Sequence, residues 1–342
     1  MKGKKRNNVP VRLVDVARTA GVSTMTASRV MRGEKRVAEA SRDAVQAAAL
    51  RLGYVPNQVA GSLRSRRSGI VAVIVPTLTG SVFAETIRGM TDAFDVHDYQ
   101  LMIGESSYDI EREERVISAL IQRRPDAVIV VGVKHTPQAR LMLQSAGIPV
   151  AEIWDQTTHP IDNVVGFSNF HAAYDMVKGL LKKGYRNIGL ATGPIVPGNR
   201  AAERTEGYMA ALRELDSAPG PSIVVPYYNF LDSALKGGRE IADFLRNQRS
   251  IDCLFCTNEL IAIGAIVACS RQGMNIPQDV AVAGFGDVEA ASLITPDLTT
   301  VKIRGLEMGR RAAEVIARRL VDDTVEPEII DVGYEIIWRN SA

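Results

Sequence analysis

The sequence has few of the features that mark secreted or membrane-embedded proteins. Its three cysteines, Cys253, Cys256 and Cys269, are too few and too clustered for a disulfide framework, which favours a cytoplasmic location. The longest apolar runs, such as 70–75, fall far short of the roughly 20 residues that a membrane-spanning helix needs. No apolar segment follows the basic residues 1–6, so a secretory signal is not expected. We therefore expect a protein that is neither exported nor embedded in a membrane.

Motifs of common enzyme classes are also absent. The sequence contains no Gly-rich phosphate loop, no Gly-x-Ser-x-Gly elbow and no His-Glu-x-x-His pattern, which argues against an enzyme on a doubly wound fold. The spacing of Cys253 and Cys256 invites a metal or redox interpretation, but no second Cys or His pair lies nearby. Because these residues sit in an apolar, strand-like run, we interpret them as buried core thiols. Neither a metal nor a cofactor is expected.

Charge is distributed very unevenly along the chain. Residues 1–68 hold 15 Lys and Arg against 4 Asp and Glu, a balance of +11, whereas residues 69–342 hold 26 against 35, a balance of −9. A segment with such an excess of positive charge is suited to a polyanion, which would repel the acidic remainder. The chain is therefore predicted to have two parts with opposite electrostatic preferences.

The basic part reads as three short helices at about 13–20, 23–31 and 39–52. Gly21 breaks the first helix, Ser23 is placed to cap the second, and Gly33 ends it. A short helix, a tight glycine-containing turn and a second helix make a helix-turn-helix, whose second helix enters the DNA major groove. We predict a DNA-binding headpiece over residues 1–56, followed by a brief hinge helix and basic linker over 57–68.

From residue 69 onward, apolar strand-like runs alternate with amphipathic helical segments, a pattern typical of parallel, doubly wound α/β sheets. More than ten elements are too many for one sheet, so we expect two similar lobes with a ligand cleft between them, at the carboxyl ends of the strands. Predicted strands are 70–75, 100–104, 127–133, 150–154, 187–191, 223–225, 253–256 and 280–284, and predicted helices include 84–97, 110–123, 172–183 and 199–215. We expect lobe 1 over 69–167 and 302–329, and lobe 2 over 168–301 and 330–342.

Several motifs resemble the lactose-repressor/galactose-repressor family. In the headpiece they are Asp15-Val-Ala, Ala20-Gly-Val-Ser, Thr26-Ala-Ser-Arg-Val and Leu52-Gly-Tyr-Val-Pro-Asn57; in the body they are Phe83-Ala-Glu, Arg204-Thr-Glu-Gly-Tyr, Thr257-Asn-Glu, Val282-Ala-Gly-Phe and Pro296-Asp-Leu-Thr-Thr-Val. The resemblance covers nearly the whole chain. It implies a homodimeric repressor on a pseudo-palindromic operator, with a sensor domain like periplasmic sugar-binding proteins. Within the family, the runs Thr77–Glu85, Lys134–Pro137, Val165–Phe170 and Phe255–Asn258 look most like the gluconate-type repressors.

Matching positions imply the residues that would contact DNA. Thr24 and Met25 stand where the family varies with operator sequence, and Met25 offers an apolar surface to a thymine methyl. Thr26 and Ser28 offer hydroxyl groups to phosphates or base edges, Arg29 can form paired hydrogen bonds with guanine, and Arg32 is expected to contact phosphate. The remaining members of the predicted set are Arg12 and Asn57. The alternatives are that Met25 and Thr26 only pack the headpiece core and that Arg29 is solvated or bound to phosphate alone.

In the hinge, Leu63 matches the family leucine that wedges into the minor groove, and Ala60 packs beside it. Gly61 departs from the family's long polar residue and costs about 1 kcal/mol against Ala in a helix, so the hinge helix is expected to be less stable away from DNA. A plain hinge-core role is the alternative for Leu63.

The resemblance also implies an effector site formed by Ser81, Phe83, His135, Asp155, Arg204, Asn258 and Glu259. Sugar-binding relatives carry an Asp where this chain has Gly286, and losing a carboxylate reduces repulsion toward an anionic ligand. Arg204, His135 and Lys134 are candidates to pair with a ligand carboxylate, so we predict a sugar acid such as gluconate or a keto-gluconate. The alternatives are a neutral sugar or purine effector, a surface role for these loop residues, and a capping role for His135. Asp287 is expected to cap the following helix.

Regulation is expected to follow a population shift, in which the effector favours a lobe arrangement that separates the hinges and releases DNA. The sequence leaves the sign of the response open, and induction is favoured for a catabolic sugar acid. Because no apolar heptad tail follows the last strand, a dimer is expected rather than a tetramer. A transporter's sugar-binding protein that does not bind DNA is the remaining alternative, and the basic headpiece argues against it.

Overall fold

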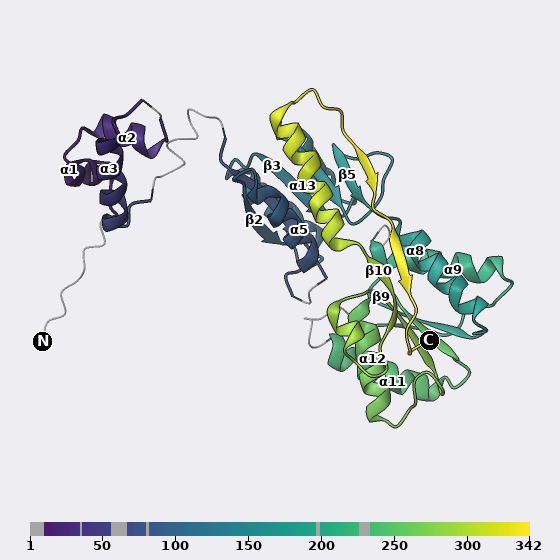
Figure 1. Cartoon of the computed structure of the whole chain (residues 1–342). Coiled ribbons are helices and arrows are strands. Elements are labelled where there is room, and N and C mark those ends of the chain that lie inside the picture. Colours follow the sequence, from purple (N-terminus) through teal and green to yellow (C-terminus); the bar gives the residue numbers. More distant parts are fainter. Residues whose placement is uncertain (1–9, 35, 56–66, 80–81, 196–198, 226–232) are drawn as a thin grey trace, which may run out of the picture. The chain divides into compact units, whose positions relative to one another are not determined.

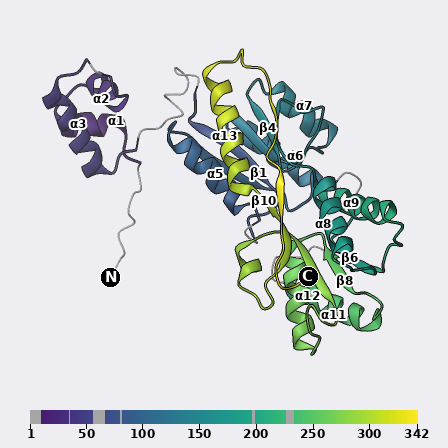
Figure 2. The ribbon, with the colours of Figure 1, turned by 45° about the vertical axis from the view of Figure 1, so that its right-hand side comes forward.

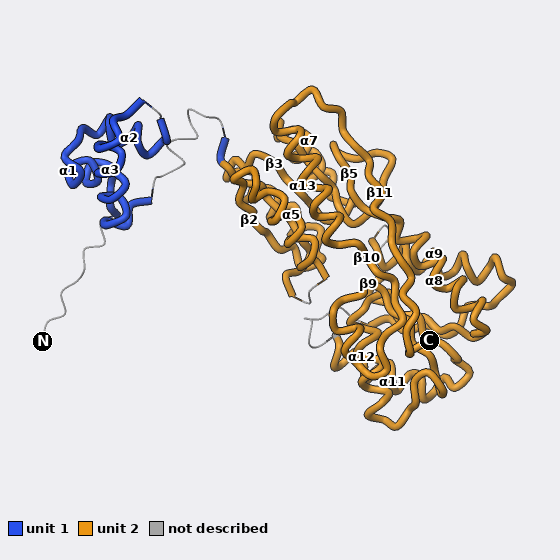
Figure 3. Tube along the Cα trace, viewed as in Figure 1, with its two compact units in different colours: residues 1–68 blue, residues 69–342 orange. Residues whose placement is uncertain are grey.

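The structure is a computed structural model that describes residues 10–34, 36–55, 67–79, 82–195, 199–225 and 233–342. The chain forms two compact units, residues 1–68 and residues 69–342, which Figure 3 colours separately. This division coincides with the change from basic to acidic composition and with the predicted end of the linker. We call the two units the headpiece and the body.

The headpiece consists of helices α1 (Leu13–Ala20), α2 (Thr24–Met31) and α3 (Glu39–Leu52), as predicted. Gly21 ends α1 in the left-handed conformation (φ 67°), which glycine adopts without steric cost. The Ser23 hydroxyl accepts a hydrogen bond from the Thr26 backbone N–H and so caps α2. The core between the helices consists of small apolar side chains, including Val16, Ala27 and Val45. These local signals and this small core produce the helix-turn-helix.

The body contains two six-stranded sheets, each with helices on both faces (Figures 1 and 2). The first sheet is entirely parallel, with strand order β11-β5-β4-β3-β1-β2. Its strands are β1 (Ile70–Val75), β2 (Gln100–Glu105), β3 (Ala127–Val131), β4 (Val150–Ile153), β5 (Asn163–Gly166) and β11 (Ile329–Asp331). Its helices are α5 (Ala84–Asp95), α6 (Ile110–Ile121), α7 (Pro137–Ser145) and α13 (Gly305–Val321). This sheet and these helices form lobe 1.

Lobe 2 repeats the architecture, with strand order β12-β10-β9-β8-β6-β7 and one antiparallel pair, β10 with β12. Its strands are β6 (Ile188–Thr192), β7 (Ser222–Val224), β8 (Cys253–Cys256), β9 (Ala281–Gly286), β10 (Thr299–Ile303) and β12 (Tyr334–Ile337). Its helices are α8 (Asn169–Lys182), α9 (Arg200–Glu214), α11 (Gly238–Asn247) and α12 (Glu259–Arg271), with the short π-helix η1 (Ser233–Gly237) and the short 3-10 helix η2 (Glu289–Ser292). The predicted two-lobed, doubly wound α/β fold is therefore what the structure has.

The chain passes between the lobes after β5, after β10 and after β11. Two of the expected lobe boundaries, 301/302 and 329/330, lie two residues before the ends of the strands that they were meant to follow. Lys302 and Ile303 still pair with β12 in lobe 2, and Ile330 and Asp331 still pair with β5 in lobe 1. Four short strands, β5, β10, β11 and β12, were not among the predicted ones. Strand β10 contains two threonines, Thr299 and Thr300. In the fold both are buried, and the Thr300 hydroxyl donates to Glu259.

Helices α5 and α13 lie side by side on one face of the lobe 1 sheet (Figures 1 and 2) and approach closely at glycines. A Cβ atom at Gly309 would overlap the carbonyl oxygen of Thr86, and one at Gly89 would overlap that of Leu306. Thr86 also accepts a hydrogen bond from the indole of Trp154, 3.2 Å from Nε1 to Oγ1. The close helix contact therefore holds Trp154 at the end of β4.

We predict that Gly309→Ala lowers the free energy of unfolding by about 1–3 kcal/mol, because α13 must move away from α5 to accommodate the methyl group. Helix propensity alone would give the opposite sign, a gain of about 1 kcal/mol. Denaturant unfolding of the wild-type and variant proteins measures the difference. An unchanged or increased stability would show that the two helices are not in close contact.

Candidate functional site

A cavity of about 340 Å³ lies between the lobes at the carboxyl ends of the lobe 1 strands. It is lined by Pro76, Val82, Phe83, Ser106, Tyr108, Asp109, Ile110, Glu113, Val131, Gly132, Val133, Lys134, Trp154, Asp155, Asn199, Arg200, Ala201, Arg204 and Asn258. Lobe 2 contributes the first turn of α9 and the residue that caps α12. This is the place where open α/β sheets bind ligands.

One wall of the cavity is aromatic. Phe83 and Trp154 are both buried and meet edge to face, with ring centroids 4.7 Å apart. Trp154 adopts a left-handed backbone conformation (φ 75°) and is fixed by its hydrogen bond to Thr86. A rigid apolar surface beside fixed polar groups is suited to the faces of a small ring or a polyol chain.

Three residues, Asp155, Asn169 and Arg204, form a buried polar network, and the first and last of them line the cavity. The Asn169 side chain donates to Asp155 Oδ1 (2.6 Å) and accepts from Arg204 Nε (2.9 Å). Arg204 also donates to the Thr257 carbonyl (2.7 Å) and lies 3.8 Å above the Phe285 ring. Burial raises the pKa of Asp155, and the charges of Arg200 and Arg204 oppose that rise. The network holds Arg204 in one orientation at the cavity.

Arg200, one turn earlier on α9, reaches across to lobe 1. Its Nη1 lies 3.6 Å from Asp155 Oδ2, and its guanidinium lies 5.9 Å from the centre of the Phe83 ring. Burial raises the pKa of the Tyr108 hydroxyl, while the charges of Arg200 and Arg204 and a hydrogen bond with Arg200 lower it. Lys134 lies at the same cavity and is exposed. Three basic side chains therefore converge on one ligand-sized space.

His135 lies behind the cavity wall. Its Nδ1 is 2.6 Å from Glu113 Oε1, its Nε2 is 3.5 Å from Glu152 Oε1, and its side chain is fully buried. Burial lowers the pKa of the imidazole, but the hydrogen bonds and charges of the two glutamates outweigh it and raise the pKa to about 9. His135 is therefore charged at neutral pH and contacts Glu113, which itself lines the cavity.

Glu259, beside the capping residue Asn258, is also buried away from the lining. Its Oε2 accepts from the Thr300 hydroxyl (2.6 Å), and burial raises its pKa to about 8. The expected capping role of Asp287 is wrong. The short helix η2 begins after Val288 without a side-chain cap, and Asp287 instead pairs with Arg339 (2.7 Å).

Of the predicted effector residues, the structure brings Phe83, Asp155, Arg204 and Asn258 together at the cavity. His135 and Glu259 lie behind it, Gly286 is not part of the lining, and Ser81 lies outside the described residues. Sequence reasoning missed Arg200, the segment that joins β2 to α6 and the first turn of α6, whose lining residues are Ser106, Tyr108, Asp109, Ile110 and Glu113. The signal was available, because this segment also follows the carboxyl end of a strand.

Half of the predicted DNA-contacting residues lie exposed on α2 or at the ends of α1 and α2. Met25 is 65% exposed and therefore does not pack the headpiece core. Arg12, Thr24, Arg29 and Arg32 are exposed, while Thr26 and Ser28 are partly buried and Thr26 bonds the Ser23 hydroxyl. Both Arg29 and Arg32 pair with Glu34, at 3.7 and 2.8 Å. Asn57, Ala60 and Leu63 lie outside the described residues.

The three cysteines are free and buried, and burial raises the pKa of each thiol, which confirms the prediction of core residues. Within the described ranges, no group of His, Cys, Asp and Glu is arranged to hold a metal ion. No helix in that same part of the chain is long and apolar enough to cross a membrane.

Both units match known families. Residues 12–57 match the bacterial regulatory proteins of the lacI family, and residues 68–334 match the periplasmic binding proteins and sugar binding domain of the LacI family. The chain belongs to the LacI family. It is a DNA-binding transcriptional regulator and not an enzyme.

Individual relatives match over nearly the full length. The transcriptional regulator GntR of Escherichia coli is 34% identical over 331 residues, 95% of this chain and 96% of the relative. The repressor PurR of Pectobacterium carotovorum is 30% identical over 330 residues, 96% of each chain. The crystal structure of a LacI family regulator from Silicibacter pomeroyi superposes with a TM-score of 0.89 at 38% identity, covering 97% of this chain and 99% of that one.

The pH dependence of stability provides a test of the buried histidine. Because the pKa of His135 is raised from 6.5 to about 9, its stabilising contribution is complete below about pH 6.5 and is lost as pH rises through 9. We predict that the difference in unfolding free energy between wild type and His135→Gln is on the order of 2–3 kcal/mol larger near pH 6 than near pH 10.

Glu259, whose pKa is also raised, is present in wild type and in His135→Gln. Its contribution to the pH dependence therefore cancels when the two unfolding free energies are subtracted. Thermal or urea unfolding at several pH values gives the curve. A difference that does not change with pH would mean that His135 is not charged in the folded protein.

Proposed function

We propose that this LacI-family regulator is a homodimeric repressor of carbohydrate catabolism genes and is released from its operator by a sugar acid of the gluconate or keto-gluconate class. The observation that carries the proposal is the convergence of Arg200, Arg204 and Lys134 on the cavity beside the Phe83–Trp154 wall. Guanidinium groups bind carboxylates through paired hydrogen bonds, and the aromatic wall is suited to a carbon chain. The resemblance to the gluconate-type repressors supports the same class of effector.

Asp155 does not make the cavity unsuitable for an anion. Its carboxylate is held by Asn169 and by the Arg200 guanidinium, so its charge is already balanced within the wall. Gly286 does not line the cavity, so the proposal rests on the basic side chains and not on the loss of a carboxylate at that position.

A neutral sugar or a purine is the alternative effector. The aromatic wall would also suit a purine ring, and PurR is among the relatives. A sugar-binding protein that does not bind DNA is no longer an alternative, because residues 12–57 match the family's DNA-binding region. A DNA-binding regulator with free, buried thiols is expected to act in the cytoplasm.

On DNA, we propose that Thr24 and Met25 read base edges, that Thr26, Ser28 and Arg29 contact bases or phosphates, and that Arg12 and Arg32 contact phosphates. The exposure of Met25 at the start of α2 supports base reading, because residues at the start of a recognition helix enter the groove. Asn57, Ala60 and Leu63 keep the roles that the family resemblance implies for the hinge.

We predict that gluconate raises the melting temperature of the wild-type protein and that Arg200→Gln weakens gluconate binding about ten- to a hundredfold, because a charged hydrogen bond is lost. Glucitol, which has the same chain length but no carboxylate, should bind equally to both proteins. Arg213→Gln is the matched control, since Arg213 is exposed in the last turn of the same helix. Calorimetry measures affinity, and fluorescence anisotropy of bound DNA measures release.

Binding of a neutral sugar or a purine, with no response to sugar acids, would overturn the effector class and leave the regulator assignment standing. Tighter DNA binding in the presence of gluconate would overturn induction.

We predict that Arg32→Gln weakens binding to all DNA sequences and reduces the slope of log affinity against log salt by about one, because one phosphate contact is lost. Met25→Ala should instead relax the preference at one base pair of each half-site and leave the salt slope unchanged. Both are measured on duplexes selected from a random pool, with Arg213→Gln as control. A changed salt slope for Met25→Ala, or none for Arg32→Gln, would contradict the assignment.

A further inference from the structure

The segment that joins β2 to α6, together with the first turn of α6, forms one side of the cavity. Tyr108, Asp109 and Glu113 all line it, and Asp109 caps α6 by accepting a hydrogen bond from the Arg112 backbone N–H (2.7 Å). Glu113 is in the first turn of α6, and its side chain is only 10% exposed. A nearly buried carboxylate therefore lies at a ligand-sized space, in the lobe opposite Arg204.

Glu113 does not pair with the basic side chains at the cavity in any contact that the structure gives. Its partner is the fully buried His135, 2.6 Å from Nδ1 to Oε1. On the other side of the ring, Nε2 lies 3.5 Å from Glu152, whose own Oε2 accepts the Ile161 backbone N–H (2.6 Å). Arg140 approaches Glu152 at 4.0 Å.

Placing a charged imidazole between two carboxylates in a lobe interior is costly, because each ion loses its water. Replacing such buried charged groups by apolar residues of similar volume commonly leaves the folded state as stable or makes it more stable. What the arrangement provides is position: the fully buried His135 ring, with Nε2 3.5 Å from Glu152 in β4, bonds Glu113 Oε1 and holds it at one point of the cavity wall. A carboxylate accepts about four hydrogen bonds, of which His135 occupies one.

The backbone of the same segment is strained. Ser107 and Tyr108 both adopt left-handed conformations, with φ of 54° and 58°, which non-glycine residues rarely take. Strain of this kind persists where the surrounding structure enforces it, and it clusters at ligand-binding sites. Here the enforced geometry places Tyr108 beside Arg200 and the first turn of α6 against the cavity.

We propose that Glu113 is a ligand-contacting residue, which accepts hydrogen bonds from the hydroxyl groups of a polyhydroxy effector, and that His135 is the positioning residue that holds its carboxylate. The inference rests on the proposed function in one respect, that the cavity takes a polyhydroxy effector. It adds an orientation: the hydroxyl-bearing end of the ligand faces Glu113 in lobe 1, and the carboxylate faces Arg200 and Arg204 in lobe 2.

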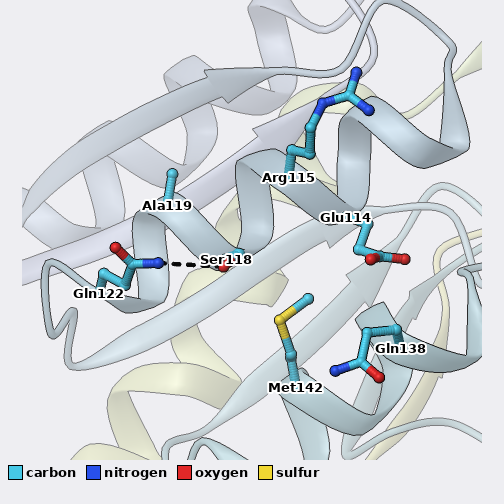
Figure 4. Close-up of a pocket in the computed structure, with 7 residues that line it drawn as sticks. All are labelled: Glu114, Arg115, Ser118, Ala119, Gln122, Gln138 and Met142. Atoms are coloured by element: carbon cyan, nitrogen blue, oxygen red, sulfur yellow. Dashed lines mark hydrogen bonds between the residues drawn. The ribbon is translucent and has the colours of Figure 1, made fainter.

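The neighbouring residue provides a matched control. Glu114 follows Glu113 on α6, but it lines a separate groove of about 380 Å³ between α6 and α7, together with Gln138 and Met142 (Figure 4). Its carboxylate accepts a hydrogen bond from the Thr136 hydroxyl. The same Glu-to-Gln change can therefore be made at two adjacent positions that face different spaces.

The experiment measures gluconate and glucitol affinity by calorimetry for wild type, Glu113→Gln, His135→Gln, the double variant and Glu114→Gln. Glu113→Gln should weaken both ligands about ten- to a hundredfold, because hydrogen bonds to a charged acceptor are lost, and Glu114→Gln should change neither. His135→Gln should weaken both ligands in the wild-type background but have no further effect when Glu113 is already Gln. A purely structural role for His135 would leave its effect intact in the double variant.

The outcomes separate this inference from the proposed function. If Arg200→Gln weakens the binding of gluconate alone and Glu113→Gln weakens the binding of gluconate and glucitol, the proposed function and the inference about Glu113 are both supported. If glucitol binds and gluconate does not, the sugar-acid effector is overturned. The effect of Glu113→Gln on glucitol affinity then decides whether Glu113 contacts the ligand. Unchanged affinities for Glu113→Gln, independent effects of the two substitutions, or no binding of either ligand to wild type would overturn the inference. Circular dichroism of each variant checks that it is folded.

Discussion

The cavity depends on the side chain of one buried residue, Asn169. Its amide donates to the Asp155 carboxylate and the Trp154 carbonyl of lobe 1 and accepts from the Arg204 guanidinium of lobe 2. Without it, two buried charged groups would each lack a hydrogen bond, at a cost of several kcal/mol. Asn169 is the first residue of α8, immediately after the chain first passes between the lobes. The connection between the lobes and the polar groups of the site are therefore set by the same hydrogen bonds.

The rest of the site follows from having two sheets whose strands are parallel except for β12. In each lobe the parallel strands present their carboxyl ends at one edge, so loops distant in sequence are brought to one place. Lobe 1 contributes an aromatic wall and buried carboxylates, and lobe 2 contributes arginines from the first turns of α9. A ligand that contacts both sets has different contacts in different lobe arrangements. That difference is what an effector needs in order to shift the equilibrium between them.

Charged residues have different roles in the two units of the chain. The headpiece, with its charge balance of +11, supplies the non-specific attraction to DNA, and the acidic body does not compete for it. The body instead uses its charges in pairs, as in Arg200 with Asp155 and His135 with Glu113. The charges of the headpiece therefore provide long-range attraction to DNA, whereas the ion pairs of the body fix the positions of side chains.

The sequence by itself determined the two-part organisation, the helix-turn-helix and the alternation of strands and helices, because these depend on composition and on spacings of a few residues. It also marked Phe83, Asp155, Arg204 and Asn258, which lie next to strand ends or helix starts and match family motifs. Only the tertiary structure placed His135 behind the wall, brought Arg200 to Asp155 and showed Glu113 at the cavity. Those contacts join residues about 20 to 45 positions apart on different elements, and a local pattern carries no information about which buried partner a charged side chain will meet. Their geometry is decided by how the lobes pack, because a buried charge must take whichever partner the fold brings within reach.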